Sequence, residues 1–146
     1  MATEVSFAVN GEVAATLVGA AEILDEQVNR ILDDTSALLL TQIKRNASGR
    51  PGPNAPTGDY RRSWTRRKIK DGYNVGTNRP QARRLEMGFY GRDSLGRMYQ
   101  QQPYPHVDPA VDAITPSYLA AMESLAALIT DGKVSGVNVS FKGLMT

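Results

Sequence analysis

Residue types that carry out acid–base or nucleophilic chemistry are sparse in this chain. It has one histidine, His106, and no cysteine, which excludes a cysteine nucleophile, a thiolate metal site and a disulfide. His106 follows Pro105 in a proline-rich loop, where a lone histidine is more often structural than a general base. No nucleophile elbow, glycine-rich phosphate loop or His/Cys metal spacing occurs. The sequence therefore predicts no catalytic residue, no metal and no cofactor.

Glu86 is the other residue that could act as an acid. It lies two residues after Arg84 and three after Arg83 in the chain. An acid beside two guanidinium groups is more often an ion-pair partner than a catalyst. We therefore expect Glu86 to pair with these arginines.

Positive charge gathers in the middle of the chain. Residues 44–97 hold 14 Lys and Arg against 4 Asp and Glu, residues 1–43 hold one Arg against seven acids, and residues 98–146 hold two Lys against four acids. The total of +2 therefore hides a strongly polarised molecule. Such polarity favours a surface that meets a polyanion, or a subunit that stacks its positive face on the negative face of a neighbour.

One part of this basic region has the composition of a nucleic-acid surface. Tyr60 and Trp64 are interleaved with the basic residues Arg61, Arg62, Arg66, Arg67, Lys68 and Lys70. Basic side chains neutralise phosphates and aromatic rings can stack on bases. However, Trp64 fits a core position equally well, and no helix-turn-helix, ribonucleoprotein motif or zinc finger is present. Nonspecific DNA contact and a solvated or interfacial charged face both stay open.

Two helices are predicted to support this region. Apolar residues recur at steps of three or four over residues 12–47, and Lys44, Arg45, Gly49 and Pro51 mark the end of that helix. A second helix is predicted for residues 109–130, with Pro116 as a point where it kinks or restarts. The longest nearly apolar run, residues 13–21, is far shorter than the ~20 residues that cross a bilayer, so we expect no membrane contact.

The remaining segments predict loops and strands. Residues 48–58 are rich in Pro and Gly and predict a flexible loop, and residues 59–108 predict a basic β region. Within it, Asp71-Gly72 indicates a hairpin, residues 81–87 fit either a strand or a helical turn, and residues 89–102 predict a hairpin whose tip spans 91–97. Short strands are predicted for residues 4–9 and 134–142.

These elements together predict a single α+β domain over residues 1–146. A long N-terminal helix and a C-terminal helix would pack on a small antiparallel β-sheet. An extended basic hairpin would project from that sheet.

The order of several short motifs resembles a known family. After the long helix come Pro56-Thr57-Gly58 and Arg61-Arg62-Ser63, then Val75-Gly76-Thr77-Asn78, then Ala82, Glu86 and Gly88, and last Pro103-Tyr104-Pro105-His106-Val107-Asp108-Pro109-Ala110. Over about residues 12–130 this is similar to the tail-completion or head–tail joining proteins of long-tailed bacteriophages. The chain departs from the family pattern at Gln81, where an aromatic residue is common, and in the longer insertion 89–102.

The resemblance implies a structural protein of the virion neck, assembled in the host cytoplasm. Such a protein forms a closed homo-oligomeric ring, expected to be sixfold, between the head connector and the tail tube, and DNA passes through its lumen. The adjacent connector or stopper proteins and the tail terminator or tail tube proteins would be its partners. The residues that lie at the ring interface or face the channel would then be Arg61, Arg62, Arg66, Arg67, Arg83, Arg84 and Glu86. Contacts with adjacent rings would come from Arg50, Pro53, Asn54, Arg92, Asp93 and Arg97.

Three alternatives stand beside this hypothesis. The chain could be the tail terminator ring of the same neck, or a small nonspecific DNA-binding module that contacts duplex directly. A hydrolase that depends on His106 is the third.

Overall fold

The computed structural model describes residues 11–130. Its residues fall into two compact units, and residues 31–119 make up one of them. The described parts of the other unit are residues 11–30 and 120–130. The strands predicted for residues 4–9 and 134–142 lie outside the described residues.

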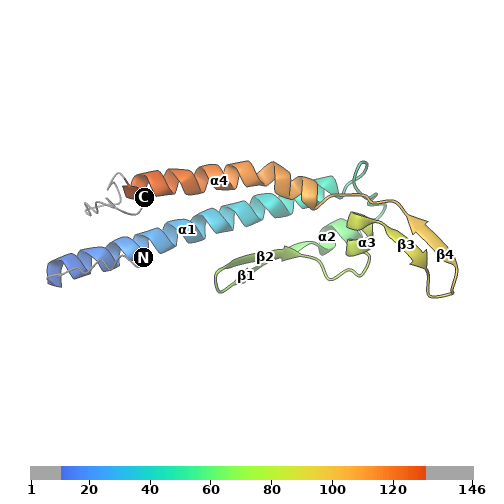
Figure 1. Ribbon diagram of the computed structural model, residues 1–146, viewed down its shortest axis with the longest axis horizontal. Helices are drawn as coiled ribbons and strands as arrows, with labels where there is room; N and C mark the ends of the chain where they lie inside the picture. Colours follow the sequence, from blue (N-terminus) through green and yellow to red (C-terminus); the bar gives the residue numbers. More distant parts are fainter. Residues whose placement is uncertain (1–10, 131–146) are drawn as a thin grey trace, which may run out of the picture. The chain divides into compact units, whose positions relative to one another are not determined.

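Two long helices run through both units. Helix α1 spans Gly11–Asn46 and helix α4 spans Asp108–Thr130, close to the predicted ranges (Figure 1). Helix α1 ends where the sequence predicts: Lys44 and Arg45 occupy its last turn, and Gly49 follows with a φ of 140°. Pro116 lies inside α4, which continues through it.

The short elements all belong to the unit of residues 31–119. In chain order they are α2 (Asp59–Ser63), β1 (Thr65–Ile69), β2 (Gly72–Gly76), α3 (Ala82–Met87), β3 (Phe89–Arg92) and β4 (Met98–Gln101). Strands β1 and β2 pair antiparallel, as do β3 and β4. The α+β class is confirmed. Residues 81–87, for which the sequence left strand and helical turn open, supply helix α3.

The arrangement of the strands differs from the predicted single sheet. Among the described residues, the four strands form two separate two-stranded hairpins. Trp64 ends helix α2 with extended backbone, and β1 begins one residue later. The Trp64 residue is only 6% exposed and packs inward.

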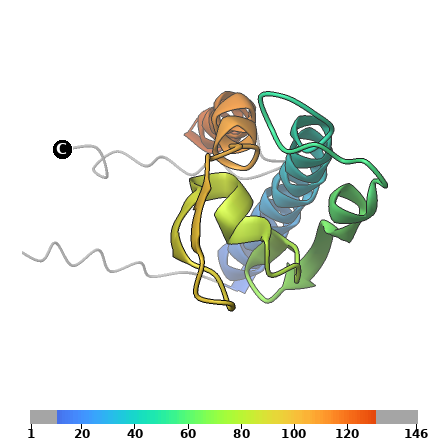
Figure 2. The same ribbon diagram turned by 90° about the vertical axis from the view of Figure 1, so that its right-hand side faces the viewer.

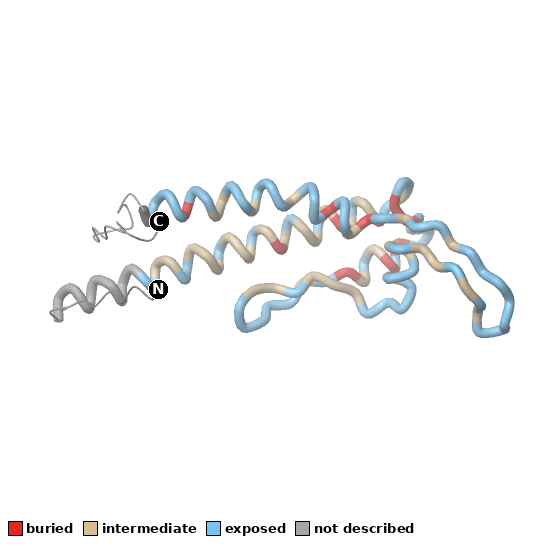
Figure 3. Tube along the Cα trace, viewed as in Figure 1, coloured by how far each residue is buried: buried red, intermediate tan, exposed pale blue. Residues whose placement is uncertain are grey.

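The core of residues 31–119 lies where the end of α1, helix α2 and the first turn of α4 meet. Its buried members are Ile43, Ala47, Tyr60, Trp64 and Ala110. Figure 3 shows the buried positions concentrated in these segments. Burial of apolar surface at this junction is the main favourable contribution that holds three sequence-distant segments together.

The loop between α1 and α2 turns back beside the end of α1 (Figure 2). Gly52 and Pro53 are both buried. A Cβ placed on Gly52 would lie 2.0 Å from the backbone oxygen of Asn46, so no larger residue fits there without a shift of the backbone. This close approach fixes the path by which the chain leaves the helix.

The other unit contributes helical residues only, within the described range. Leu24 and Val28 of α1 are half-buried there, and Leu125 of α4 is buried. Glu26 and Arg30 form an exposed ion pair 3.6 Å apart, of a kind that contributes little to stability. No helix in the described part of the chain combines the length and hydrophobicity that a membrane span requires.

Candidate functional site

The single histidine is at the centre of the core. His106 is fully buried, and its Nε2 lies 2.8 Å from the hydroxyl of Tyr60. Its Nδ1 lies 2.9 Å from the backbone oxygen of Tyr104 and 2.9 Å from Oε2 of Glu86. Both of these oxygens are acceptors, so the neutral ring carries its proton on Nδ1 and Nε2 accepts the Tyr60 hydroxyl. His106 is therefore a structural residue, as the loop context predicted.

Glu86 caps the start of α4. Its Oε2 accepts the backbone N–H groups of His106 at 2.9 Å and Val107 at 3.0 Å, and its Oε1 accepts that of Asp108 at 2.9 Å. Partial burial acts to raise the pKa of Glu86, but these three backbone donors outweigh it and the pKa is lowered overall. The expected ion pair with Arg83 or Arg84 is wrong. The carboxylate instead turns toward the unpaired N–H groups that any helix start presents.

Two aromatic side chains pack against the histidine. The ring centroid of Trp64 lies 5.8 Å from that of His106, and the Tyr60 centroid lies 5.6 Å away, both edge to face. Burial raises the pKa of the Tyr60 hydroxyl, which keeps it protonated as the donor to Nε2. Tyr60 and Trp64 therefore belong to the core and do not form a stacking platform for bases.

Arg66 anchors the first hairpin to helix α1. Its Nη1 donates to the backbone oxygen of Asp33 at 2.9 Å and to Oγ of Ser36 at 3.0 Å, and it pairs with the Asp33 carboxylate. Hydrogen bonding from Arg66 lowers the pKa of that carboxylate. The guanidinium also lies 5.0 Å from the centroid of the Tyr73 ring. Arg66 thus contacts residues of its own chain.

The other predicted interface arginines divide into two groups. Arg61 donates to Oγ of Ser48 at 3.1 Å, and Arg62 donates to the backbone oxygen of Thr57 at 3.1 Å. The remaining basic residues, on β1, beyond its end and on α3, are exposed: Arg67, Lys68, Lys70, Arg83 and Arg84. No ion pair within the described residues involves any of these five.

The second hairpin ends in an ordered tip. Oδ1 of Asp93 accepts the backbone N–H groups of Leu95 and Arg97, both at 2.9 Å, and Oδ2 accepts Nε of Arg97 at 2.8 Å. Arg92 donates to the backbone oxygen of Gly96 at 2.7 Å. The acid and arginines expected to meet adjacent rings therefore first hold the tip together, and Leu95 projects from it 74% exposed.

The loop residues predicted for the same contacts occupy different environments. The Arg50 guanidinium lies 3.9 Å from the ring centroid of Tyr104 and donates to the backbone oxygen of Gly52. Pro53 is fully buried, whereas Asn54 is exposed. Pro53 therefore positions the loop, and Asn54 and Arg50 face outward.

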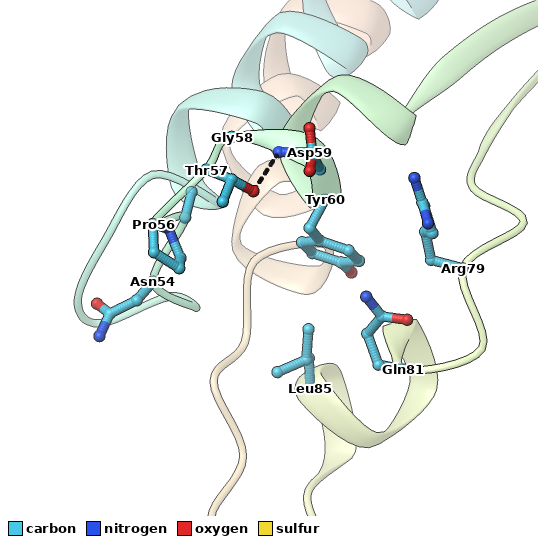
Figure 4. Close-up of a pocket in the computed structure, with 10 residues that line it drawn as sticks. Asn54, Pro56, Thr57, Gly58, Asp59, Tyr60, Arg79, Gln81 and Leu85 are labelled. Carbon is cyan, nitrogen blue, oxygen red and sulfur yellow. Dashed lines mark hydrogen bonds between the residues drawn. The ribbon is translucent and has the colours of Figure 1, made fainter.

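A hollow of about 380 Å³ lies beside this loop (Figure 4). Its wall is formed by residues 54–60 together with Arg79, Gln81 and Leu85. Asp59 in this wall is paired with Arg62. Within the described residues, no group of three or more His, Asp or Glu could hold a metal ion.

Sequence reasoning missed one surface feature, an apolar face on the second hairpin. Tyr90 is 75% exposed, Met87 70% and Met98 56%. The alternation of strand residues would have placed Tyr90 and Arg92 on one face. The concentration of positive charge instead favoured an interpretation in which the arginines make the contacts.

The comparisons with known proteins give one family. The model described as "Bacteriophage HK97-gp10, putative tail-component" matches residues 11–88. This match covers more than half of the chain and includes α1, the first hairpin and α3. No curated protein and no solved structure shows a significant match.

Proposed function

Because this chain belongs to the HK97-gp10 family of bacteriophage tail components, we propose that it is a ring-forming subunit of the virion neck. In this role it completes the tail or joins it to the head, and DNA passes through the ring. Copies of the chain contact each other around the ring, expected to be sixfold. The connector or stopper lies on one side and the tail terminator or tail tube on the other.

The observation that supports this proposal is that some charged residues connect elements of the chain, whereas others are exposed on its surface. Arg66 and Glu86 connect α1, the first hairpin, α3 and α4 within one subunit. Arg67, Lys68, Lys70 and Arg83 are exposed and take part in no ion pair within the described residues. Exposed like charges on a fixed scaffold repel each other unless a polyanion or an acidic partner surface neutralises them. A neck offers both, as neighbouring subunits and as DNA in the lumen.

A role without catalysis fits the same geometry. His106 is fully buried and its two ring nitrogens are occupied by Tyr60, Tyr104 and Glu86. The histidine therefore has no free nitrogen to offer a substrate. We propose that the protein works by assembly, and that loss of His106 harms it only through loss of folding.

Complementation of a phage that lacks this gene tests the neck assignment. Arg67→Glu with Lys70→Glu, and separately Arg92→Glu with Arg97→Glu, should leave a folded subunit but yield unjoined heads and tails in electron micrographs. Arg30→Glu with Arg45→Glu is the control with the same change in charge, and it should support plaque formation. Normal virions with both test variants, or normal virions in the complete absence of the protein, would refute the assignment.

The tail terminator is the second candidate in the same neck, favoured only by the shared family. Purified tails that have not yet met heads distinguish the two roles. A terminator ring is already present on such tails, whereas a completion ring that binds at the head is absent from them.

A nonspecific DNA-binding module is the third candidate, and the exposed β1 residues Arg67 and Lys68 favour it. Titration of duplex DNA with the free subunit at several salt concentrations tests it. Tight binding with a steep loss of affinity as salt rises would support this role. Weak binding by the free subunit leaves the neck role as the better account.

A further inference from the structure

We propose that the second hairpin of one copy docks on the outward face of the first half of α4 in the next copy. This proposal rests on the ring proposed above and names the surfaces that build it. The donor surface is the outward hairpin face, defined by Tyr90, Arg92 and Met98. The acceptor surface is the outward α4 face, defined by Val111, Asp112, Thr115 and Leu119.

The register of the hairpin places the donor residues on one side. Tyr90 pairs with Gln100 and Arg92 pairs with Met98, and cross-strand partners share a face. Tyr90 is 75% exposed and Met98 56%. Exposed aromatic and methionine side chains beside an arginine have the composition that interface centres favour.

The opposite side of the hairpin packs in part on its own chain, through Phe89, although Tyr99 on that side is 46% exposed. Phe89 and Tyr99 lie there with ring centroids 6.1 Å apart, and the Arg84 guanidinium lies 4.2 Å from the Phe89 centroid. A two-stranded hairpin that packs on only one side is marginally stable in isolation. The outward hairpin face is therefore the side on which a second subunit can add packing.

The outward α4 face has matching properties. Val111 is 42% exposed and Leu119 51%, and they lie along one side of the helix with Thr115 between them. Asp112 is exposed beside them. Residues 108–130 contain three acids, Asp108, Asp112 and Glu123, and no Lys or Arg. The outward α4 face therefore combines apolar side chains with negative charge. It complements the outward hairpin face, which combines apolar side chains with the positive charge of Arg92.

The hairpin is held away from the first half of α4 in its own chain. The connection from β4 to α4 is held by the bond from the Tyr104 N–H to the Leu85 oxygen, 2.7 Å, and by the Glu86 cap on residues 106–108. These bonds fix the hairpin on the side of α3, and Figure 1 shows it directed away from the first half of α4. The occupant that we propose for the outward α4 face is a second copy, whose hairpin carries the complementary charge.

The contact is heterologous, because donor and acceptor are different surfaces. Such a contact leaves one free donor and one free acceptor on every partial assembly, and it closes into a ring when the rotation permits. Both surfaces lie outside residues 11–88, so the proposed ring contact is supplied by residues beyond the family match.

Cysteine cross-linking tests this contact directly, because the chain has no native cysteine. The full chain with Met98→Cys and Thr115→Cys is incorporated into phage particles by complementation and then oxidised. We expect a covalent ladder of multimers on non-reducing gels. Each single variant should give no covalent dimer, and Met98→Cys paired with Leu38→Cys, on exposed α1, should give no ladder. Intact particles whose double variant stays monomeric on the gel would overturn the docking proposal and leave the neck role standing.

A second experiment uses variants that disable one surface at a time. Tyr90→Ser with Arg92→Asp removes the donor, and Leu119→Ser with Asp112→Lys removes the acceptor. Each variant alone should lose joined virions by at least tenfold, while Leu38→Ser, which also removes an exposed apolar side chain, should not. Circular dichroism checks that each variant is folded. Normal virion yield from both variants contradicts the proposal, whereas absence of the wild-type protein from virions would overturn the neck role as well.

Discussion

The backbone N–H of His106 donates to Oε2 of Glu86 over 2.9 Å, and this bond joins α3 to the start of α4 across 20 residues. The same carboxylate accepts the N–H groups of Val107 and Asp108. One short helix thus fixes where a long one begins. Both proposed surfaces, the outward hairpin face and the outward α4 face, take their positions from this connection.

Replacement of Glu86 by alanine should destabilise the protein more than the replacement of an ordinary, partly exposed side chain does. Three backbone N–H groups lose their acceptor together, and each unsatisfied donor costs about 1–3 kcal/mol before water or movement compensates. We expect the free energy of unfolding to fall by about 2–4 kcal/mol in urea titrations followed by circular dichroism. Glu123→Ala, on exposed α4, is the matched control and should change it by less than about 0.5 kcal/mol. Equal losses in both variants would contradict the capping role.

The lowered pKa of Glu86 predicts a pH dependence of stability. A carboxyl whose folded pKa lies below its ordinary value of 4.5 stabilises the fold when pH is above that value. The contribution is lost as pH falls through the lower, folded pKa. Stability should therefore be held above about pH 5 and decline below 4.5, when thermal unfolding is followed at a series of pH values.

Glu86→Gln supplies the comparison for this pH dependence, because it removes the titrating group and keeps the shape. Its stability should be lower than that of the wild type near neutral pH and should fall less steeply below pH 4.5. A decline as steep as that of the wild type would assign the acid sensitivity to other carboxyls, such as Asp33 and Asp93, whose pKa values are also lowered.

The hydrogen bond between Tyr60 and His106 should couple these residues energetically. Tyr60→Phe removes the donor and leaves the buried Nε2 of His106 unpaired, which we expect to cost about 1–2 kcal/mol. His106→Phe should cost more, because the backbone oxygen of Tyr104 and the carboxylate of Glu86 also lose the Nδ1 donor. The double variant should be less destabilised than the sum of the two, by about 0.5–1.5 kcal/mol in calorimetry. Strict additivity would show that the two side chains act independently.

Loss of Arg66 should loosen the first hairpin without unfolding the core. Because Asp33 is half exposed, solvent screening weakens its ion pair with Arg66, and we expect Arg66→Ala to change global stability little. Amide hydrogen exchange should increase in β1 and β2 more than in the last turns of α1. Arg67→Ala, an exposed neighbour on the same strand, should leave the exchange rates unchanged. Unchanged exchange in the Arg66 variant would argue against its role as an anchor.

Gly52→Ala tests the close approach between the loop and α1. The new Cβ would lie 2.0 Å from the Asn46 backbone oxygen, so the loop must move, at an expected cost of about 2 kcal/mol or more. Gly72→Ala is the matched control, because a Cβ there meets nothing within 4 Å. The control should change the melting temperature little. Comparable melting temperatures for the two variants would show that the loop adapts freely.

The sequence predicted the helices well because their signals are local. The periodic apolar residues of α1 and the stop at Lys44, Arg45 and Gly49 lie within a few turns of each other, and the structure follows them. The first hairpin turns at Lys70-Asp71, one residue before the predicted Asp71-Gly72, and this turn and the one around Gly96 are likewise properties of short segments. The α+β class followed from these local features.

The site was less predictable because its partners are far apart in the chain. Arg83 and Arg84 lie within three residues of Glu86 in the chain. The Glu86 carboxylate nevertheless accepts backbone N–H groups that lie 20 to 22 residues away. Leu38 was placed on the apolar stripe of the long helix, yet it is 52% exposed, since the stripe that packs is defined by Ile43 and Ala47. Such contacts depend on how the helices meet, which periodicity alone does not specify.

The position of Trp64 gives the protein a built-in optical reporter. It is the single tryptophan of the chain, and its ring lies edge to face with His106 in the core of residues 31–119. Its fluorescence therefore follows that unit alone, while the helical ellipticity follows both. Denaturation curves from the two signals would coincide if the units melt as one cooperative block and would separate if residues 11–30 and 120–130 unwind first.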